Sequence, residues 1–436
     1  MSRLRPQSAR AILVALLRSP RFASVLVTVS VAISALGFLI VRLMGWPGYL
    51  AMLTGVIVLM VCVVWARLDE IDLVVPPLSL LVFLGWAAIS SIWSEYQWVT
   101  LGGVSSLFAF TFIGLFIVYM RDTLQTVRAW GDVLRVILGA SLGMEIFAGI
   151  IIDTAIPYLG IQARIAELGP ISGLLQNRNQ LGMLALIGAV TFATELRTRS
   201  VRPLTGVLSL VGASACLLLT RSPIIILAAV VVGFAAAVLY GVRHVSPERR
   251  QAWQFAILGI AVALIVGAWT IRGSLVALFN AEGALTYRLQ LWQKIVALLP
   301  GSFVEGWGWT GRWHTDIAPY LAFTTSSHRP APSALNAYLD VLFQLGSVGL
   351  VIFVGMLGLA FVRSWLLAGH RRSILYAWPA LVMIVLLLVN LAESSILVDF
   401  GWLTFVVCCA TASRELSWRS AVSAPPAPGT LSSASE

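Results

Sequence analysis

The chain has 436 residues, of which 59% are hydrophobic and only 11% are charged. A soluble domain carries about 25% charged residues, so this composition excludes an ordinary soluble globular protein. The formal net charge of +10 does not indicate a nucleic-acid partner, because the basic residues lie between apolar runs and no folded basic domain is evident.

Apolar runs of about 18–25 residues recur along the chain, and each is long enough to cross a bilayer as an α-helix. The sequence therefore predicts an all-α, polytopic integral membrane protein with about twelve transmembrane helices. No cleavable signal peptide is evident, because Arg18 and Arg21 interrupt the first short apolar stretch. The predicted spans cover residues 23–44, 48–66, 74–94, 100–120, 131–152, 178–195, 204–220, 222–242, 253–272, 336–362, 375–392 and 396–413.

Basic residues set the predicted orientation. With the N-terminus in the cytoplasm, roughly two thirds of the 29 lysines and arginines fall in cytoplasmic segments, in agreement with the positive-inside rule. Both termini are then cytoplasmic. The predicted organisation is a cytoplasmic segment 1–22, nine spans in 23–272, one large extracytoplasmic loop 273–335, three spans in 336–413 and a tail 414–436. The tail is rich in alanine, proline and serine, which predicts disorder.

The predicted outer side carries basic residues that this rule does not explain. They gather before the sixth span, in the tight turn between the seventh and eighth spans, and in the loop 273–335. That loop is far longer than a typical connection of about 4–6 residues, and we expect it to be folded and to rest on the membrane surface. The outer basic residues are Arg42, Arg164, Arg178, Arg221, Arg272, Arg288, Lys294, Arg312 and Arg329.

Residues 286–300, TYRLQLWQKIVALLP, predict an amphipathic helix with an arginine in its apolar face. On a helical wheel the apolar side chains gather within about 100° of Arg288, whereas Lys294 lies on the opposite face. We expect this stripe to dock against the helical bundle and Arg288 to reach into a polar cavity. The stripe comprises Leu289, Leu291, Trp292, Ile295, Val296, Leu298 and Leu299.

Arginine presents five donors in a planar fork that matches phosphate oxygens. A cluster of outer arginines therefore favours an anionic group held at the bilayer surface, such as a lipid-linked diphosphate. The alternative is that each arginine extends to lipid headgroups or caps a helix end, and Arg42, Arg164 and Arg272 need nothing more. Arg221 fits this alternative poorly, because it lies in the very short turn of LLLTRSPIIILA. We expect it to face protein or a cavity and to share one anion site with Arg288.

Six segments carry further motifs: SSIWSEYQW (90–98), GPISGLLQNRNQLGMLALI (169–187), LLLTRSPIIILA (217–228), YRLQLWQKIVALLPGSFVEGWGWTGRW (287–313), LNAYLDVLFQLGSVGLVIFV (335–354) and NLAESSIL (390–397). In this order they resemble the O-antigen ligase and Wzy-type polysaccharide polymerase superfamily of bacterial membrane glycosyltransferases. The resemblance covers about residues 70–415.

The resemblance implies a helical bundle of the GT-C type in the bacterial plasma membrane, with its active site on the extracytoplasmic side. It implies transfer of a glycan from an undecaprenyl diphosphate carrier to a sugar hydroxyl, by a polymerase or a ligase, without a metal, a nucleotide sugar or another cofactor. The family's functional arginines fall here on Arg221, Arg288 and Arg178. Further substrate contacts are expected from Asn177, Trp292, Arg312, Arg329, Asn336 and Asp340.

The sequence departs from the family pattern at two places. The family's outer turn has serine before arginine, whereas here Arg221 precedes Ser222 and Pro223. Leu335 stands where the family has a histidine that is the usual candidate for acceptor activation or diphosphate contact. His328 is a nearby substitute; alternatively a carboxylate acts, or no base is needed because diphosphate is a good leaving group.

Three carboxylates lie near the predicted outer ends of the spans: Glu95, Asp340 and Glu393. A carboxylate at the membrane edge is costly without a partner. We therefore expect one of the three to form an orienting ion pair with Arg288 or Arg329.

The spans themselves hold few reactive groups. Glu145 is the deepest acid, and it belongs either to a structural pair or to a groove for the lipid carrier. The cysteines all lie in apolar runs and predict no disulfide, metal site or redox motif; they are Cys62, Cys216, Cys408 and Cys409.

Two other functions stay open. A flippase for a lipid-linked glycan needs polar residues along its whole path, whereas here the inner halves of the spans are nearly free of charge and no internal repeat is found. A structural or scaffold protein is disfavoured by a long folded loop that turns an arginine into its apolar face. The bilayer and a glycan donor and acceptor are the expected partners.

Overall fold

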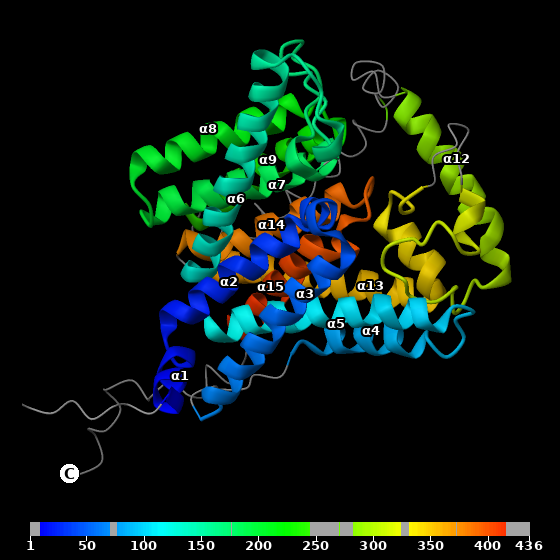
Figure 1. Ribbon diagram of the computed structural model, residues 1–436, viewed down its shortest axis with the longest axis horizontal. Helices are drawn as coiled ribbons and strands as arrows, with labels where there is room; N and C mark the ends of the chain where they lie inside the picture. The colour runs from blue at the N-terminus through cyan, green and yellow to red at the C-terminus, as the bar shows by residue number, and fades with distance from the viewer. Residues whose placement is uncertain are drawn as a thin grey trace, which may run out of the picture.

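The computed structural model describes residues 9–69, 76–175, 177–244, 270, 282–323, 331–371 and 373–415. Apart from one isolated bridge between Ile156 and Ile161, all regular secondary structure of these residues is helical, which confirms the predicted all-α class. Figure 1 shows most of the helices gathered in one bundle, with α12 on the opposite side of the molecule from α1.

The helices follow the apolar runs of the sequence. The first part of the chain forms α1 (Ala9–Leu17), α2 (Pro20–Ala35), α3 (Gly37–Ala66), α4 (Leu78–Ile89), α5 (Gln97–Met120), α6 (Thr123–Ile146) and α7 (Arg178–Thr198). The second part forms α8 (Pro203–Leu219), α9 (Pro223–His244), α12 (Glu282–Leu298), α13 (Ala337–His370), α14 (Ala377–Val389) and α15 (Asp399–Glu415). Short 3₁₀ or π turns lie at Phe147–Ile151, Pro157–Leu159, Gly173–Leu175, Leu299–Gly301, Tyr320–Phe323, Ile374–Tyr376 and Ser395–Leu397.

Six of the described helices are long and apolar enough to cross a membrane: α3, α5, α6 with the turn that follows it, α7, α9 and α13. Shorter apolar helices include α2, α4, α8 and the segment Ile374–Val389. This pattern supports a polytopic membrane protein. The predicted ninth span, 253–272, lies outside the described residues except for Thr270.

The first apolar run is divided differently from the prediction of one span over 23–44. A new helix, α3, already begins at Gly37 and then bends at Gly45, where φ is 72°. Glycine has no Cβ and adopts positive φ without a clash, and Pro47 cannot donate a helical hydrogen bond. Hydropathy does not register such a backbone break. Residues 37–44 therefore form a separate short arm, called the elbow below.

The main core surrounds α15, which is buried continuously from Phe400 to Ala412. Indole N–H groups in this core donate to threonine hydroxyls on neighbouring helices, as buried tryptophans require. Trp402 donates to Thr111 of α5 at 2.9 Å, and the indole of Trp378 on α14 donates to the Thr191 hydroxyl at 2.9 Å. These bonds fix the helices that carry the segments described next.

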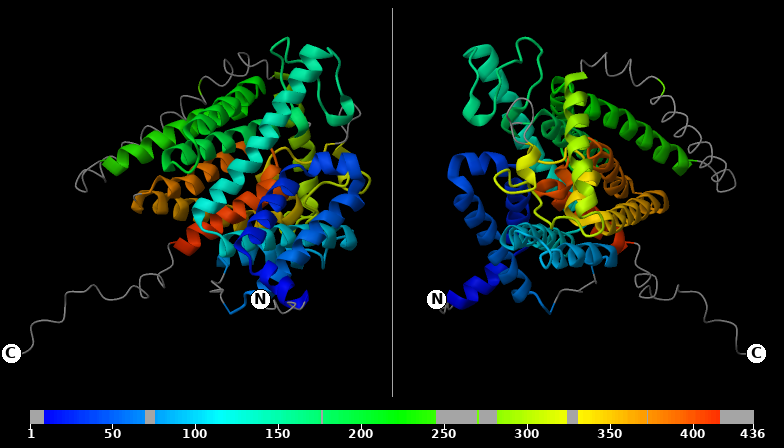
Figure 2. Two further views of the ribbon diagram at one scale, coloured as in Figure 1. Left: turned by 60° about the vertical axis from the view of Figure 1, so that its left-hand side comes forward. Right: turned by 90° about the vertical axis from the view of Figure 1, so that its right-hand side faces the viewer.

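The described part of the predicted loop 273–335 is folded around a second, smaller core. Leu291, Ile295 and Leu299 of α12 pack there with aromatic residues of the loop and of α13. Figure 2 shows α12 crossing one end of the bundle, so its apolar face does dock as expected. The predicted stripe is too wide, however, because Leu289 and Val296 are 47% and 54% exposed. A helical wheel orders side chains by angle but does not say how broad the contact is.

One glycine seats this loop against the bundle. A Cβ added to Gly103 of α5 would lie 2.6 Å from the backbone carbonyl carbon and oxygen of Thr310, whereas one added to Gly102 meets nothing within 4 Å. We expect Gly103→Ala to lower the free energy of unfolding by about 1–3 kcal/mol, because backbone atoms cannot yield as a flexible side chain does. Thermal unfolding in detergent measures this effect.

Gly102→Ala is the matched control for that substitution. It makes the same change one residue away in the same helix, where alanine is the better helix former and should leave stability unchanged or slightly raised. Equal unfolding midpoints for the two variants would contradict the close contact between α5 and the loop.

Candidate functional site

A cavity of about 730 Å³ lies at the predicted outer end of the bundle. Its size falls within the roughly 300–1,000 Å³ typical of small-molecule sites. The elbow, the start of α7, the outer loop and the start of α15 all contribute to its wall. The lining residues are Ser34, Gly37, Phe38, Gln162, Pro170, Ser172, Leu175, Asn177, Arg178, Gln180, Arg312, Pro332 and Asp399.

The start of α7 places two predicted site residues on this wall. Asn177 is the N-cap, and its side chain accepts a hydrogen bond from the backbone N–H of Asn179 at 2.9 Å. Asparagine is favoured here because its short carbonyl satisfies an N–H that the first turn leaves free. Arg178 follows as the first helical residue. Its side chain and that of Asn177 both line the cavity.

Glu145 supports the segment that leads into α7. Its Oε1 atom accepts hydrogen bonds from the backbone N–H groups of Ser172 and Gly173 at 3.1 and 2.9 Å. The carboxylate is fully buried, and Ser172 lines the cavity. Glu145 was predicted to belong either to a structural pair or to a groove for the lipid carrier. The geometry favours the structural role, with backbone N–H groups as the partners of the carboxylate.

Arg288 leaves the apolar face of α12 and reaches the segment between α14 and α15. Its Nη2 atom lies 3.3 Å from Oε1 of Glu393 and donates to the carbonyl of Ala392 at 3.1 Å. Both side chains are largely buried, with 17% and 10% exposure. Glu393 is one of the three carboxylates from which an orienting partner was expected. Nε of Arg288 is buried without a hydrogen-bond partner among the described residues.

Glu393 also joins α12 to α7 and to the turn before α9. Oε1 of Glu393 accepts a hydrogen bond from Nδ2 of Asn179, and Oδ1 of Asn179 accepts one from the hydroxyl of Ser222 at 2.7 Å. Ser222 is completely buried. The sequence analysis selected neither Asn179 nor Ser222. Both residues belong to the quoted motifs. The predicted site residues, however, were their neighbours Asn177 and Arg221.

Backbone bonds hold Glu393 in this position. The N–H of Ala337 donates to the carbonyls of Asn390 and Glu393, both at 3.0 Å. Asn336 caps α13 through its Oδ1 atom, which accepts from two backbone N–H groups, and its Nδ2 atom donates to the carbonyl of Leu391 at 3.1 Å. Asn336 is thus a helix cap that fastens the 390–398 segment.

Arg178 is within electrostatic range of both Arg288, which repels it, and Glu393, which attracts it. Two cations brought together at low dielectric are unfavourable unless an anion joins them. One carboxylate is already paired with Arg288. This arrangement suits an additional anion between α7 and α12. The sequence had predicted such a shared anion site for Arg221 and Arg288, whereas here Arg178 takes the place of Arg221.

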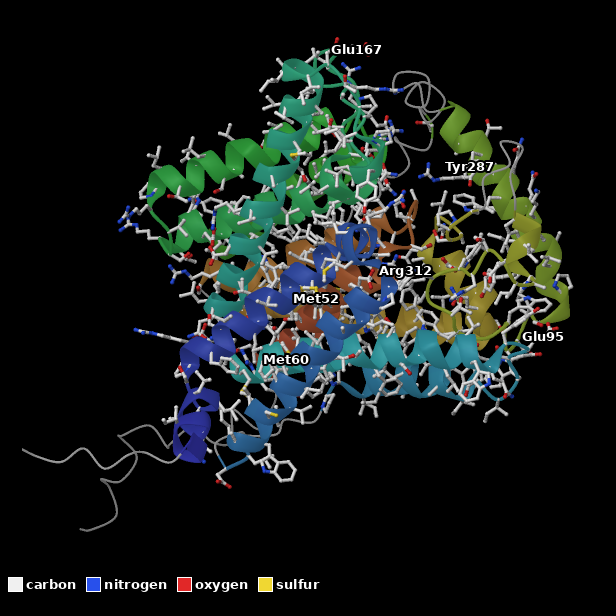
Figure 3. All side chains as sticks on the ribbon, viewed as in Figure 1. Met52, Met60, Glu95, Glu167, Tyr287 and Arg312 are labelled. Carbon is white, nitrogen blue, oxygen red and sulfur yellow. The ribbon has the colours of Figure 1, made fainter. Side chains whose placement is uncertain are left out.

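Arg312 also lines the cavity. Figure 3 shows Arg312 in the interior of the view, whereas Glu95 lies at the edge of the molecule. The Nη2 atom of Arg312 forms an ion pair with Oδ2 of Asp399, and Oδ1 of Asp399 accepts from the hydroxyl of Tyr49 at 3.2 Å. Asp399 was not selected from the sequence, because nothing local marks an aspartate at the start of an apolar run as a site residue.

Two predicted contacts have structural partners instead. Asp340 is fully buried, and neutral groups satisfy it: the indole of Trp313 and the amide of Gln344 each donate at 2.8 Å. Asp340, one of the three candidates for the arginine partner, therefore forms no ion pair with an arginine among the described residues, and Glu393 forms it instead. The indole of Trp292 donates to the carbonyl of Ala334 at 2.9 Å, which fixes the chain just before α13.

The structure does not place the remaining predicted residues at the cavity within the part of the chain that it describes. Arg221 is in the turn expected for it, with φ of 45°, but its side chain is exposed and does not line the cavity. His328 and Arg329 lie outside the described residues. Leu335, which stands in the place of the family's histidine, packs partly buried against the loop core.

Comparison with known proteins bears on these residues directly. The sequence model of the O-antigen ligase family matches residues 208–354, which include the turn at Arg221, all of α12 and the start of α13. These residues are similar to an O-antigen ligase domain. The predicted resemblance to the O-antigen ligase and Wzy-type superfamily is confirmed by this match. No curated protein sequence matches the chain.

This match supports O-antigen ligase or polymerase-type activity in general, with a lipid-linked glycan donor and a glycan acceptor at a membrane. Arg288 and Arg312 lie inside the matched region, whereas Arg178 and Glu393 come from parts of the chain outside it.

Proposed function

We propose that this protein transfers or polymerises a glycan from an undecaprenyl-diphosphate-linked oligosaccharide onto a sugar hydroxyl. The reaction takes place at the outer face of a bacterial plasma membrane, in a GT-C-type bundle with both termini in the cytoplasm. Arg178 and Arg288 bind the diphosphate of the donor. The observation that carries this proposal is that Arg178 lines a polar cavity and interacts electrostatically with Arg288, which lies in the segment that matches the O-antigen ligase family.

Arginine neutralisation supplies the main chemical contribution in this proposal. As the bond from the sugar to the diphosphate breaks, negative charge develops on the leaving phosphate oxygens. Fixed guanidinium donors stabilise that charge more strongly in a partly desolvated cavity than in water. In this proposal the reaction needs no metal.

A reconstituted transfer assay tests the function. The purified protein is incubated in EDTA with an undecaprenyl-diphosphate-linked oligosaccharide from the same organism, without nucleotide. We expect undecaprenyl diphosphate to be released together with a longer glycan. Release without added acceptor identifies a polymerase, and release only with a separate acceptor identifies a ligase.

The same preparation distinguishes a flippase. Movement of intact lipid-linked glycan across a vesicle bilayer, without release of the carrier, would replace the proposal. Charge is not confined to the predicted outer end, because Arg135 forms an ion pair with the fully buried Glu195 near the other end of α6 and α7. The transport assay is therefore the deciding control.

Glu393 should give the transfer reaction a pH dependence. Burial raises the pKa of Glu393 above its usual 4.5, although hydrogen bonding from Asn179 and the charge of Arg288 oppose the rise. Acidification should protonate this carboxyl earlier than an exposed glutamate, release Arg288 and lower kcat/KM. Glu393→Gln, which resembles the protonated form, should have low activity that stays flat over that pH range.

Stability should change in the opposite direction from activity. A carboxyl with a raised pKa binds its proton more tightly in the folded state, so its contribution to stability is present at low pH and is lost as pH rises through the folded pKa. Wild type should therefore gain thermal stability on mild acidification relative to Glu393→Gln. Superimposable pH profiles of kcat/KM for the two proteins would contradict the assigned role of Glu393.

A further inference from the structure

A second polar cluster faces the cavity from three separate elements. It consists of Arg312 of the outer loop, Asp399 at the start of α15 and Tyr49 of α3. Arg312 and Asp399 are both part of the cavity wall, and the guanidinium carbon of Arg312 lies 5.8 Å from the ring centroid of Trp46. Arg178 and Arg288, which bind the diphosphate in the proposed function, are not part of this cluster.

The pair of Arg312 and Asp399 is open to the cavity rather than sealed in the core. The Arg312 side chain is 47% exposed and that of Asp399 is 14% exposed. Asp399 has φ of 44°, a left-handed conformation that a non-glycine residue adopts at a cost. In this conformation the Asp399 carboxylate contacts the Arg312 guanidinium and the Tyr49 hydroxyl. Arg312 and Asp399 line the cavity and retain hydrogen-bonding capacity toward it, whereas Tyr49 holds Asp399 from behind.

The chemistry of this wall differs from that of the arginine pair. The carboxylate of Asp399 repels a phosphate, and it balances the charge of Arg312. Sugar hydroxyls both donate and accept, and they match a carboxylate, a guanidinium and the carboxamide of Gln162, which also lines the cavity. The ring of Phe38 on the elbow adds an apolar surface to the same wall.

We infer that the cluster of Arg312, Asp399 and Tyr49 binds the acceptor sugar. The inference rests on the proposed glycan transfer. The donor is held through its charged diphosphate, whereas the acceptor has no anionic group there and needs a neutral, hydrogen-bonding wall. Arg178 of the donor site lines the same cavity as Arg312 and Asp399, so the acceptor hydroxyl and the donor's anomeric carbon meet in this cavity.

Kinetics with each substrate varied in turn test the subsite. The probe acceptor is the repeat-unit oligosaccharide released by mild acid from the organism's own lipid-linked glycan. Asp399→Asn preserves size and tolerates the left-handed backbone, but it removes the charge. We expect the acceptor KM to rise about 10–100-fold, the loss typical of a hydrogen bond to a charged group, with the donor KM within about twofold.

Two further variants distinguish a role of the ion pair in sugar binding from a purely structural role. The double reversal Arg312→Asp/Asp399→Arg restores an ion pair between loop and α15 but inverts the wall, and we expect acceptor binding to stay lost. Asp132→Asn breaks an exposed aspartate–arginine pair, with Arg135, away from the cavity, and it should leave both KM values unchanged.

Direct binding of the same oligosaccharide, measured without donor, completes the test. We expect binding by wild type and about 10–100-fold weaker binding by Asp399→Asn. An unchanged acceptor affinity, an equal rise in donor KM, or recovery of activity in the double reversal would overturn the subsite. Wild-type protein that binds the oligosaccharide but transfers nothing would refute the proposed reaction and leave the binding assignment standing.

Discussion

Replacing Arg288 by alanine should reduce glycan transfer by about 10²–10³-fold or more, the loss typical when a fixed donor to a developing anion is removed. The physical reason is the position of its guanidinium, which is oriented by Glu393 and lies next to Arg178. Arg288→Lys should also be strongly impaired, because a lysine is a point charge that cannot form a bidentate contact. Initial rates of carrier release measure both variants.

A change in folding must be separated from this loss. Removing Arg288 leaves the Glu393 carboxylate, only 10% exposed, without its cation, and breaking such a pair typically costs about 3–5 kcal/mol. The double variant Arg288→Ala/Glu393→Gln removes both charges and should recover most of the thermal stability while staying inactive. Gln290→Ala, an exposed position on the same helix, is the matched control. Normal transfer by Arg288→Ala would refute the assignment.

The direction of Arg288 was predictable from the sequence, but its partner was not. A period of 3.6 residues places this arginine in an apolar face wherever the helix lies. Three carboxylates were equally eligible, and the choice of Glu393 depends on backbone bonds from α13 to the segment 390–398. Such bonds join residues more than fifty positions apart, and no local pattern encodes them.

The sequence also did not predict where a helix breaks or how wide the contact surface of a helix is. The elbow at residues 37–44 lies inside a continuous apolar run, where only Gly45 and Pro47 indicate a bend. The exposed Leu289 and Val296 show the same limitation for packing, because an apolar side chain is compatible with protein, lipid or solvent at an interface. The left-handed Asp399 follows from packing around α15 and has no sequence signature.

Polar residues with several possible roles were the hardest to assign. Asp340 and Asn336 occur in a strong family-like motif, yet one is satisfied by neutral donors and the other caps a helix. Asn179 carries the contact to Glu393, whereas its neighbour Asn177 was selected. In each case the residue type was suitable for a polar site. Only the three-dimensional arrangement shows whether such a residue supports the fold or lies at the site.

Arg178→Ala should cause the second large loss, again about 10²-fold or more in transfer, but with little effect on folding. Arg178 lines the cavity, and its interaction with Glu393 is a longer-range attraction, since the ion pair of Glu393 is made with Arg288. Its removal therefore leaves no paired carboxylate uncompensated. Thermal unfolding of Arg178→Ala should match that of Arg164→Ala, an exposed outer arginine away from the cavity, which should also retain transfer.

The double variant of Arg178 and Arg288 tests whether the two arginines bind one diphosphate. When two residues act on the same group, the second substitution adds little to the loss of activity caused by the first. Substitutions at independent sites instead give additive changes in activation free energy. We expect the double alanine variant to be only slightly slower than Arg288→Ala, with a coupling of about 1 kcal/mol or more. Fully additive losses would place the two guanidinium groups on different anions, and the donor's diphosphate would then contact only one of them.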